Sequence, residues 1–446
     1  MQLQWWSVLP FAMMLASIAV LPLVPATTHW WEKRSSQLTV ALVLGLPVAA
    51  WMWIAGGWEI VFAAVVEYGQ FIALLLALFI VSGGIFLKGD IEATPRNNTI
   101  FLAIGAVLAS FVGTTGAAML LIRPLLNTNA ERRYRVHTVL FTIFIVANCG
   151  GLLTPLGDPP LFLGFLRGVP FTWTFHLLPE WLFVNAMLLA AYFALDTYYH
   201  AQEPAASVRL DRTEIEPLGL RGATSFVWFL VIILAVAFAP SVDAEAIEAG
   251  HATVMDWVPL REIIMLAAAG ASYALGDRRA RFEDNQFEWG PITEVAGSLP
   301  LNRVTFFIFT GGLSSVLDNA PTYATFFEMA GQVSHPGGAL IAGVPEVYLV
   351  SISLGAVLCG AITYIGNGPN FMVKSVADSR GVEMPSFGGY VVRTLTHLVP
   401  VLAAMVCLFI AEPVWAKAIG GLGTVALLAN DVRLILAGRR LALVDS

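Results

Sequence analysis

Hydrophobic positions in this chain fall into long blocks separated by short polar stretches. A helix needs about 20 apolar residues to cross a bilayer, and most of the blocks approach or exceed that length. The blocks lie near residues 7–24, 37–57, 69–87, 99–111, 136–168, 175–195, 223–240, 259–276, 303–317, 346–378, 390–411 and 414–437. The pattern predicts an all-α polytopic membrane protein with about 11–12 transmembrane segments. Residues 58–66, between the second and third blocks, have the composition of an interfacial helix.

Four blocks have lengths that do not suit a single spanning helix. Residues 136–168 and 346–378 are too long, and each contains glycines and prolines that would break a helix. Blocks 99–111 and 303–317 are short, and each is followed at once by a second apolar stretch with polar residues at its start. We predict broken helices over the two long blocks. The short blocks lead into re-entrant hairpins, at about 112–130 and 316–333.

The two predicted breaks are copies of one motif. Thr154–Phe162 reads TPLGDPPLF and Thr363–Phe371 reads TYIGNGPNF, and a Cys-Gly pair precedes each copy. In lipid, an interrupted helix is tolerated where it lines a polar cavity or packs inside protein, and a matched pair of interruptions indicates a transporter's binding site. A Gly-Pro break also occurs as a simple kink, but two breaks at matched positions, each with a polar hairpin, favour function.

This repetition divides the chain into two similar halves. The predicted parts are an N-terminal span (1–36), a first repeat (37–195), a polar linker (196–222), a second repeat (223–411) and a C-terminal helix (412–446). Five spans per repeat make the two halves inverted. Basic residues at 132–135 and 278–281 favour the cytoplasm, which places the acidic stretch 241–258 outside, the N-terminus inside, and the two hairpins open to opposite sides.

Composition supports a membrane protein and excludes other classes. Hydrophobic residues make up 57% of the chain and charged residues only 12%, whereas a soluble domain carries about 25% charged residues. The net charge of −7 argues against nucleic acid as a partner, and the three cysteines, all in apolar segments, argue against a disulfide framework. No nucleotide-binding loop, metal-ligand spacing or nucleophile motif is visible, so we expect neither an enzyme nor a cofactor.

The chemistry of the breaks and hairpin tips predicts a cation site. Carbonyl groups freed by unwinding, together with hydroxyl, amide and carboxylate oxygens, form a cage that suits Na⁺ or a proton-coupled site. Glycine permits the backbone conformations such a cage requires. The candidate residues are Thr114, Thr115, Asn148, Thr154, Gly157 and Asp158 in the first half and Asp318, Asn319, Thr322, Thr363, Gly366, Asn367 and Asn370 in the second. Sodium is expected near Thr154–Asp158 and near Thr363–Asn367.

Asp158 and Asp318 are the predicted proton-coupling groups. A carboxylate in mid-membrane costs at least ~2.5 kcal/mol on insertion scales, so it is a functional candidate by default. The alternative is that each carboxylate caps the helix that follows it. Asn148, next to the first break, is expected either to donate to a freed carbonyl or only to pack.

Residues 151–160 and 315–322 resemble signatures of the ion transporter superfamily, in its NhaD-like sodium/proton antiporter and citrate transporter branches. The resemblance implies a multi-pass protein of the bacterial inner membrane, with ion sites at the two breaks and a homodimer formed through scaffold helices. The hairpin tips, Val-Gly-Thr-Thr-Gly and Leu-Asp-Asn-Ala-Pro-Thr, differ from the Ser-Asn-Thr tips of the dicarboxylate branch. That difference argues against a carboxylate substrate.

The leading hypothesis is exchange of Na⁺ or Li⁺ for H⁺ by alternating access. One alternative is a citrate or dicarboxylate symporter coupled to H⁺, Na⁺ or a divalent cation, in which helix N-termini bind the anion. Efflux of arsenite or another oxyanion, and a non-transporting scaffold or channel, are further alternatives. The expected partners are the lipid bilayer and a small ion or small anionic solute.

Overall fold

The structure is a computed structural model. It describes residues 33–56, 58–88, 91–213, 219–243, 246–247, 252–275, 302–333 and 339–444, together with residues 9, 10, 13, 14, 17, 27 and 30. Most of the predicted first span, residues 7–24, and the basic residues at 278–281 lie outside the described residues.

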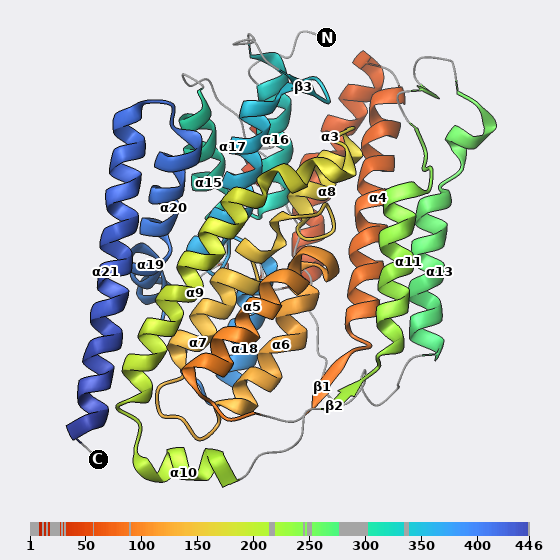
Figure 1. The fold of residues 1–446 in the computed structure, drawn as a ribbon. Coiled ribbons are helices and arrows are strands. Elements are labelled where there is room, and N and C mark those ends of the chain that lie inside the picture. The colour runs from red at the N-terminus through yellow and green to blue at the C-terminus, as the bar shows by residue number, and fades with distance from the viewer. Residues whose placement is uncertain are drawn as a thin grey trace.

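The described part of the chain is almost entirely helical (Figure 1). Its helices that are long and apolar enough to cross a membrane cover Ser35–Ile54, Val61–Ser82, Phe171–His200, Phe387–Ile410 and Val414–Ala442. Two short antiparallel pairs, β1 (Phe86–Lys88) with β2 (Gly219–Arg221) and β3 (Leu340–Ile341) with β4 (Val344–Pro345), are its only strands. The chain is therefore an all-α polytopic membrane protein, which confirms the predicted fold class.

The first half contains a helical hairpin followed by an interrupted helix. The hairpin turns at Gly113, whose φ of 83° lies in the left-handed region that glycine tolerates. Its helices are α5 (Pro95–Val112) and α6 (Thr114–Thr128). The interrupted helix and its continuation are α7 (Val136–Phe141), the π-helix η2 (Thr142–Val146), η3 (Cys149–Leu152), α8 (Pro159–Leu166), η4 (Phe171–Leu177) and α9 (Leu178–His200).

The second half repeats this order with the opposite direction. Its helices are α15 (Arg303–Ser314), α16 (Asn319–Gln332), α17 (Glu346–Cys359), η6 (Gly360–Ile362), α18 (Gly368–Ser379), α19 (Phe387–His397), α20 (Val399–Met405), η7 (Val406–Ile410) and α21 (Val414–Val444). Figure 1 shows α7, α18 and the base of the α5–α6 hairpin at the end that carries α10, whereas α8, α16 and α17 lie at the opposite end.

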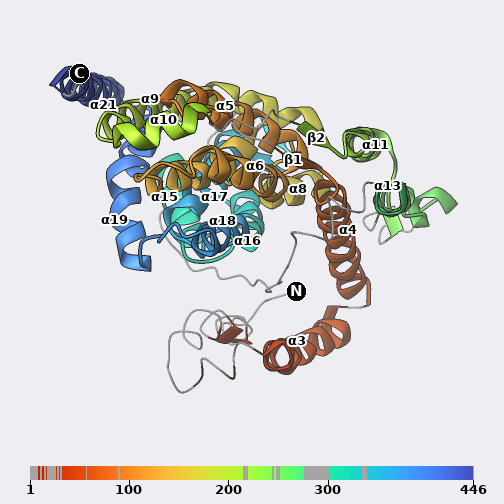
Figure 2. The ribbon, with the colours of Figure 1, turned by 90° about the horizontal axis from the view of Figure 1, so that it is seen from below.

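The remaining helices flank this core. They are α3 (Arg34–Gly56), α4 (Trp58–Ser82), α10 (Ala205–Thr213), α11 (Thr224–Phe238), η5 (Val254–Trp257) and α13 (Leu260–Leu275). Figure 2 shows α4, α11 and α13 on one side of the broken helices and α19 and α21 on the other. Residues 58–66 open the long helix α4, so they do not form the separate interfacial helix predicted for them. The polar residue that follows, Glu67, is accommodated because it pairs with Arg167 of α8 at 3.0 Å.

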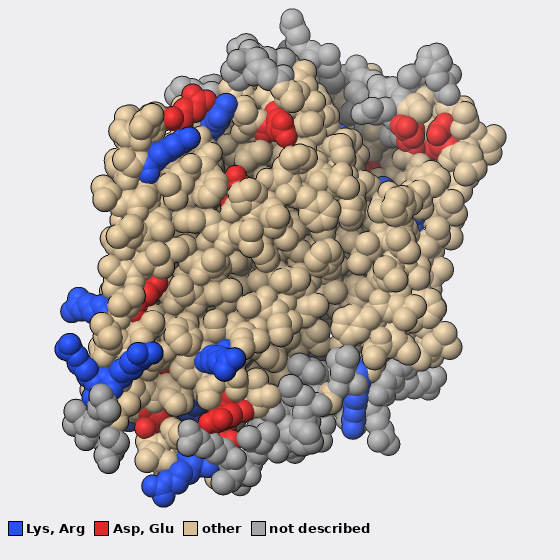
Figure 3. All heavy atoms as spheres, in the orientation of Figure 1, with Lys and Arg blue, Asp and Glu red and all other residues tan. Residues whose placement is uncertain are grey.

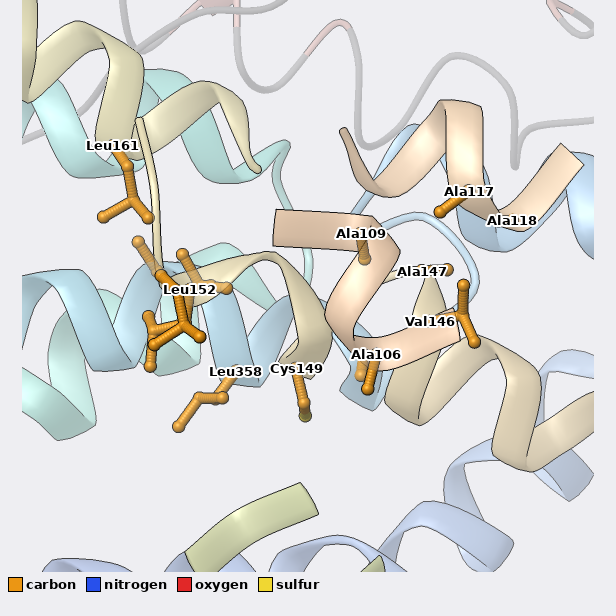
Figure 4. Close-up of a cluster of buried hydrophobic side chains, with 14 of the residues drawn as sticks. Ala106, Ala109, Ala117, Ala118, Val146, Ala147, Cys149, Leu152, Leu161 and Leu358 are labelled. Atoms are coloured by element: carbon orange, nitrogen blue, oxygen red, sulfur yellow. The ribbon is translucent and has the colours of Figure 1, made fainter. Parts of the chain in front are cut away.

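The core between the first hairpin and the first break is made of small side chains. Ala106 and Ala109 of α5, Ala117 of α6 and Ala147 are all buried, and they lie close together in Figure 4. A Cβ on Gly150 would lie 2.8 Å from the Cα of Ala106. Small residues let backbones approach closely where packing, not water exclusion, holds membrane helices together.

Candidate ion and substrate site

The first hairpin is attached to the first break by backbone hydrogen bonds. The N–H of Thr114 donates to the carbonyl of Gly157 at 2.8 Å. The hydroxyl of Thr154 donates to the carbonyl of Ser110, and it accepts from the N–H of Leu156 at 3.2 Å. Thr154 therefore lies at the predicted site, but its only hydroxyl proton is used to fasten α5 to the break.

The second break repeats this attachment. The hydroxyl of Thr363 donates to the carbonyl of Ser315 at 2.5 Å, and it accepts from the N–H groups of Ile365 and Gly366, each at 3.2 Å. The threonine shared by the two motif copies thus fastens a hairpin to a break in both halves.

Glycines let the two backbone segments of each break come into direct contact. A Cβ on Gly157 would overlap the carbonyl of Gly151, and a Cβ on Gly366 would lie 2.6 Å from the carbonyl oxygen of Gly360. Gly151 is therefore the structural equivalent of Gly360. Counted back from the motif threonines, the two Cys-Gly pairs differ in position by one residue, because the first copy has an additional glycine after Gly150.

Asp158 lies where the two halves meet. It is 1% exposed and accepts hydrogen bonds from Thr114 Oγ1 at 2.9 Å, from Asn319 Nδ2 at 2.5 Å and from Asn367 Nδ2 at 3.4 Å. These donors come from the first hairpin, the second hairpin and the second break. Asp158 is the N-cap residue of α8, but its side chain makes no capping hydrogen bond, since Pro160 has no N–H to donate and the N–H of Leu161 donates to the Asp158 carbonyl instead.

A group of asparagines connects the two breaks. Asn148 Nδ2 donates to Asn370 Oδ1 at 2.6 Å and to the carbonyl of Ile143 at 2.8 Å, so the expected bond from Asn148 to a freed carbonyl is present. Asn367 Nδ2 donates to Asn148 Oδ1 at 3.1 Å. Asn370 Nδ2 in turn donates to the carbonyls of Gly360 and Thr363 at 2.8 and 2.9 Å. The broken helices are therefore in direct polar contact.

The second hairpin tip contributes a carboxylate and an amide. Asp318 is half-buried at the N-cap of α16, where its Oδ1 accepts from the N–H of Ala320 at 3.3 Å, as its capping alternative predicts. Thr322 donates to the backbone carbonyl of Asp318 at 3.1 Å. Asn319 is fully buried, and its Oδ1 has no hydrogen-bond donor within the described part of the chain. That oxygen is available to a cation or to a hydroxyl of a bound solute.

A cavity of about 310 Å³ lies beside this network, at the lower end of the ~300–1,000 Å³ range of ligand pockets. Its polar lining includes Thr114, Thr115, Gly157, Asp158, Asp318 and Asn367, and its apolar wall is Phe71, Leu74, Leu75, Leu78 and Phe79 of α4. None of its described lining residues is Lys, Arg or His. The α4 wall belongs to the half of that helix nearest β1, so the cavity extends toward that end of the molecule (Figure 1).

Four helices begin at this network: α6 at Thr114, α8 at Pro159, α16 at Asn319 and α18 at Gly368. A helix N-terminus carries partial positive charge and leaves N–H groups without intrahelical partners, although α8 begins with two prolines and offers only the partial charge there. In the first turn of α6, these include the N–H groups of Thr115 and Gly116, both of which line the cavity. The site therefore combines carboxylates, which suit a cation, with helix ends, which suit an anion.

Sequence reasoning missed three parts of this site. Ser110 and Ser315 receive the motif threonines through backbone carbonyls, which carry no residue signature. The apolar wall of α4 was also missed, because a continuous hydrophobic helix has no pattern that distinguishes lipid contact from a cavity wall.

Hairpins inserted from opposite ends, broken helices in contact at their interruptions and a cavity with polar residues from both halves are the architecture of a secondary active transporter. A family model with the description "Putative citrate transport" matches residues 1–299 and 297–410. These matches cover most of the chain, so the chain belongs to this citrate transport family, in agreement with the resemblance to the citrate transporter branch. No curated protein matches the chain.

Proposed function

We propose that the protein transports citrate or a related carboxylate anion, coupled to H⁺, Na⁺ or a divalent cation. The observation that carries the proposal is the meeting of four helix N-termini at one cavity, in a chain of the citrate transport family. Helix N-termini bind carboxylates without a basic side chain. This proposal replaces Na⁺/H⁺ exchange as the leading hypothesis, since the family description names citrate.

Asp158 and Asp318 give such a site its requirement for a cation. Both line the cavity, and like charges 4 Å apart repel by about 4 kcal/mol at an effective dielectric constant of 20. An anion therefore binds well only when a proton or a metal cation neutralises these carboxylates. Coupling then follows from electrostatics, because a site that holds the anion without the cation is unfavourable.

Uptake of radiolabelled citrate into proteoliposomes tests the proposal. Gradients of H⁺, Na⁺ and Mg²⁺ are imposed one at a time, and we expect one of them to drive accumulation. Asp158→Asn is expected to lower gradient-driven accumulation at least tenfold, because the neutral amide does not hold a cation. Glu383→Gln, in an exposed loop, is the matched control and keeps wild-type uptake.

Two results would contradict this assignment. One is citrate uptake no faster than in protein-free liposomes under all three gradients. The other is accumulation by Asp158→Asn equal to that of the wild type, which would remove the carboxylate from the coupling mechanism.

Exchange of Na⁺ or Li⁺ for H⁺ is the second candidate, and one observation favours it. Two carboxylates line the cavity, and no described lining residue is basic. This candidate predicts that Na⁺ or Li⁺ dissipates a pH gradient in vesicles without citrate, and that Asp158→Asn with Asp318→Asn abolishes the effect. Dissipation that appears only when citrate is present would instead support symport.

We further propose that the end carrying α10 faces the cytoplasm of a bacterial inner membrane. Figure 3 shows most of the visible Lys and Arg side chains near that end, as the positive-inside rule requires. On this orientation the half of α4 that lines the cavity is its cytoplasmic half.

A further inference from the structure

A second cavity lies at the opposite end of the molecule from the central one. It has a volume of about 770 Å³ and is enclosed by α4, the C-terminal end of α8, the start of α13 and α16. Its polar lining includes Gln70, Arg167, Asp243, Arg261 and Glu328. We call this cavity the vestibule.

One of the two vestibule arginines is engaged through two of its three nitrogens and already faces two carboxylates. Arg167 Nε lies 3.0 Å from Glu67 Oε1 and 3.7 Å from Glu328 Oε1. Its Nη1 donates to the carbonyl of Ala324 at 3.1 Å. This guanidinium holds α8 against α4 and α16 and has little capacity for another anion.

The other arginine keeps most of its donors. Arg261 is 7% exposed, and its Nε donates to Glu262 Oε1 at 2.8 Å. Its two Nη groups have no acceptor among the residues that the structure describes. A guanidinium presents its N–H groups as a planar fork that matches a carboxylate, so a buried arginine with free Nη groups at a cavity wall has the donors to bind one.

Aromatic rings hold Arg261 at the boundary between the two cavities. Its Cζ lies 5.5 Å from the ring centre of Phe165 and 6.0 Å from that of Phe162. Phe165 lines the vestibule, whereas Phe162 lines the central cavity. The Phe162 ring therefore separates the central cavity from a guanidinium with unused donors.

We propose that Arg261 is a second substrate-binding residue, which binds a carboxylate group of the transported anion on the vestibule side of Phe162. The inference rests on the proposed transport of a carboxylate. Glu262 is paired with Arg261, and Glu67, Asp243 and Glu328 also face the vestibule. These acidic neighbours weaken the contact, which suits a transit site that must release its ligand as well as bind it.

The test measures citrate transport from each side of the membrane separately. Protein in sided proteoliposomes is supplied with radiolabelled citrate either at the vestibule face or at the central-cavity face. Arg261→Gln is expected to raise KM at the vestibule face about tenfold or more, with KM at the other face unchanged. Arg261→Lys keeps the charge without the fork, so we expect a smaller rise. Arg303→Gln, which removes an exposed arginine paired with Glu412, leaves both KM values unchanged.

The outcomes separate the two proposals. Wild-type protein that does not transport citrate from either face overturns the proposed function and this inference together. Citrate transport with equal KM values for Arg261→Gln and wild type at the vestibule face overturns only the role of Arg261. A rise in KM at both faces assigns Arg261 to folding or to the central site, and so also overturns the inference. If Arg261→Gln does not fold, Arg261→Lys gives the same comparison.

Discussion

Gly157 is held so close to Gly151 that the Gly151 carbonyl occupies the place of a Cβ. Alanine at 157 must push the two backbone segments of the first break apart. Overpacking of this kind lowers the free energy of unfolding by about 1–3 kcal/mol. We predict that Gly157→Ala lowers the melting temperature of the purified protein and impairs transport. At Gly388 a Cβ would meet nothing within 4 Å, so Gly388→Ala is the control. Equal melting temperatures for Gly157→Ala and wild type would contradict the close approach.

At the scale of residues, the sequence identified which residues form the site but not which contacts they make. The matched motifs pointed to Asp158, Asn367 and Thr363, because each lies at a fixed place in a repeated segment. The contact of Asn319 with Asp158 joins the two halves of the chain, and no local pattern encodes such a pairing. The free donors of Arg261 were also invisible, since they depend on which acceptors the fold leaves nearby.

At the scale of elements, Arg167 connects three helices at the vestibule end. Its contacts with Glu67, Glu328 and Ala324 join α8 to α4 and α16. These ion pairs therefore stabilise the arrangement in which the end of α8 is held against α4 and α16. Partly exposed pairs contribute about 0.2–1 kcal/mol each.

We predict that Arg167→Gln shifts the protein away from the arrangement in which Thr115 lines the central cavity. The measurement is the labelling rate of Thr115→Cys, at the cavity wall, by a membrane-impermeant maleimide in a Cys407→Ser background. We expect a rate about two- to fivefold lower, in line with the free energy of one or two exposed ion pairs. Arg303→Gln is the control. A rate equal to or above that of the Thr115→Cys background would refute this role of Arg167.

The helix boundaries show why the hydropathy pattern alone does not predict every helix end. The block at 99–111 omitted the start of α5, because residues 95–98 are polar. They join the helix since Thr94 caps it, and since buried Asn98 bonds to Asn129 at 2.9 Å and to Asp196 at 3.3 Å. Asp196 also lies beyond the predicted end of the first repeat, yet it belongs to α9 and pairs with Arg132 at 2.7 Å. Polar residues with partners from other helices are hidden from a hydrophobicity count.

At the scale of the whole molecule, the inverted arrangement sets which loops share a face of the membrane. Glu383 follows α18 and Glu412 precedes α21, and both are exposed. We predict that Glu383→Cys and Glu412→Cys react with an impermeant thiol reagent from opposite sides, with position 383 cytoplasmic. Cys149 and Cys359 are buried, so Cys407→Ser supplies a background with little labelling. Reaction of both positions from one side would be incompatible with a membrane crossing by Phe387–Ile410.

In a carrier of the proposed kind, the position of Asp158 affects how tightly ion movement is coupled to substrate movement. A single carboxylate fastens the first hairpin, the second hairpin and the second break at once. A proton or cation arriving there competes for the same lone pairs, so all three attachments change in one event. If each hairpin met a different ion-binding group, one hairpin could move while the other stayed in place, and ions would cross the membrane without substrate. Because both hairpins contact the same carboxylate, an ion that binds there acts on both of them together.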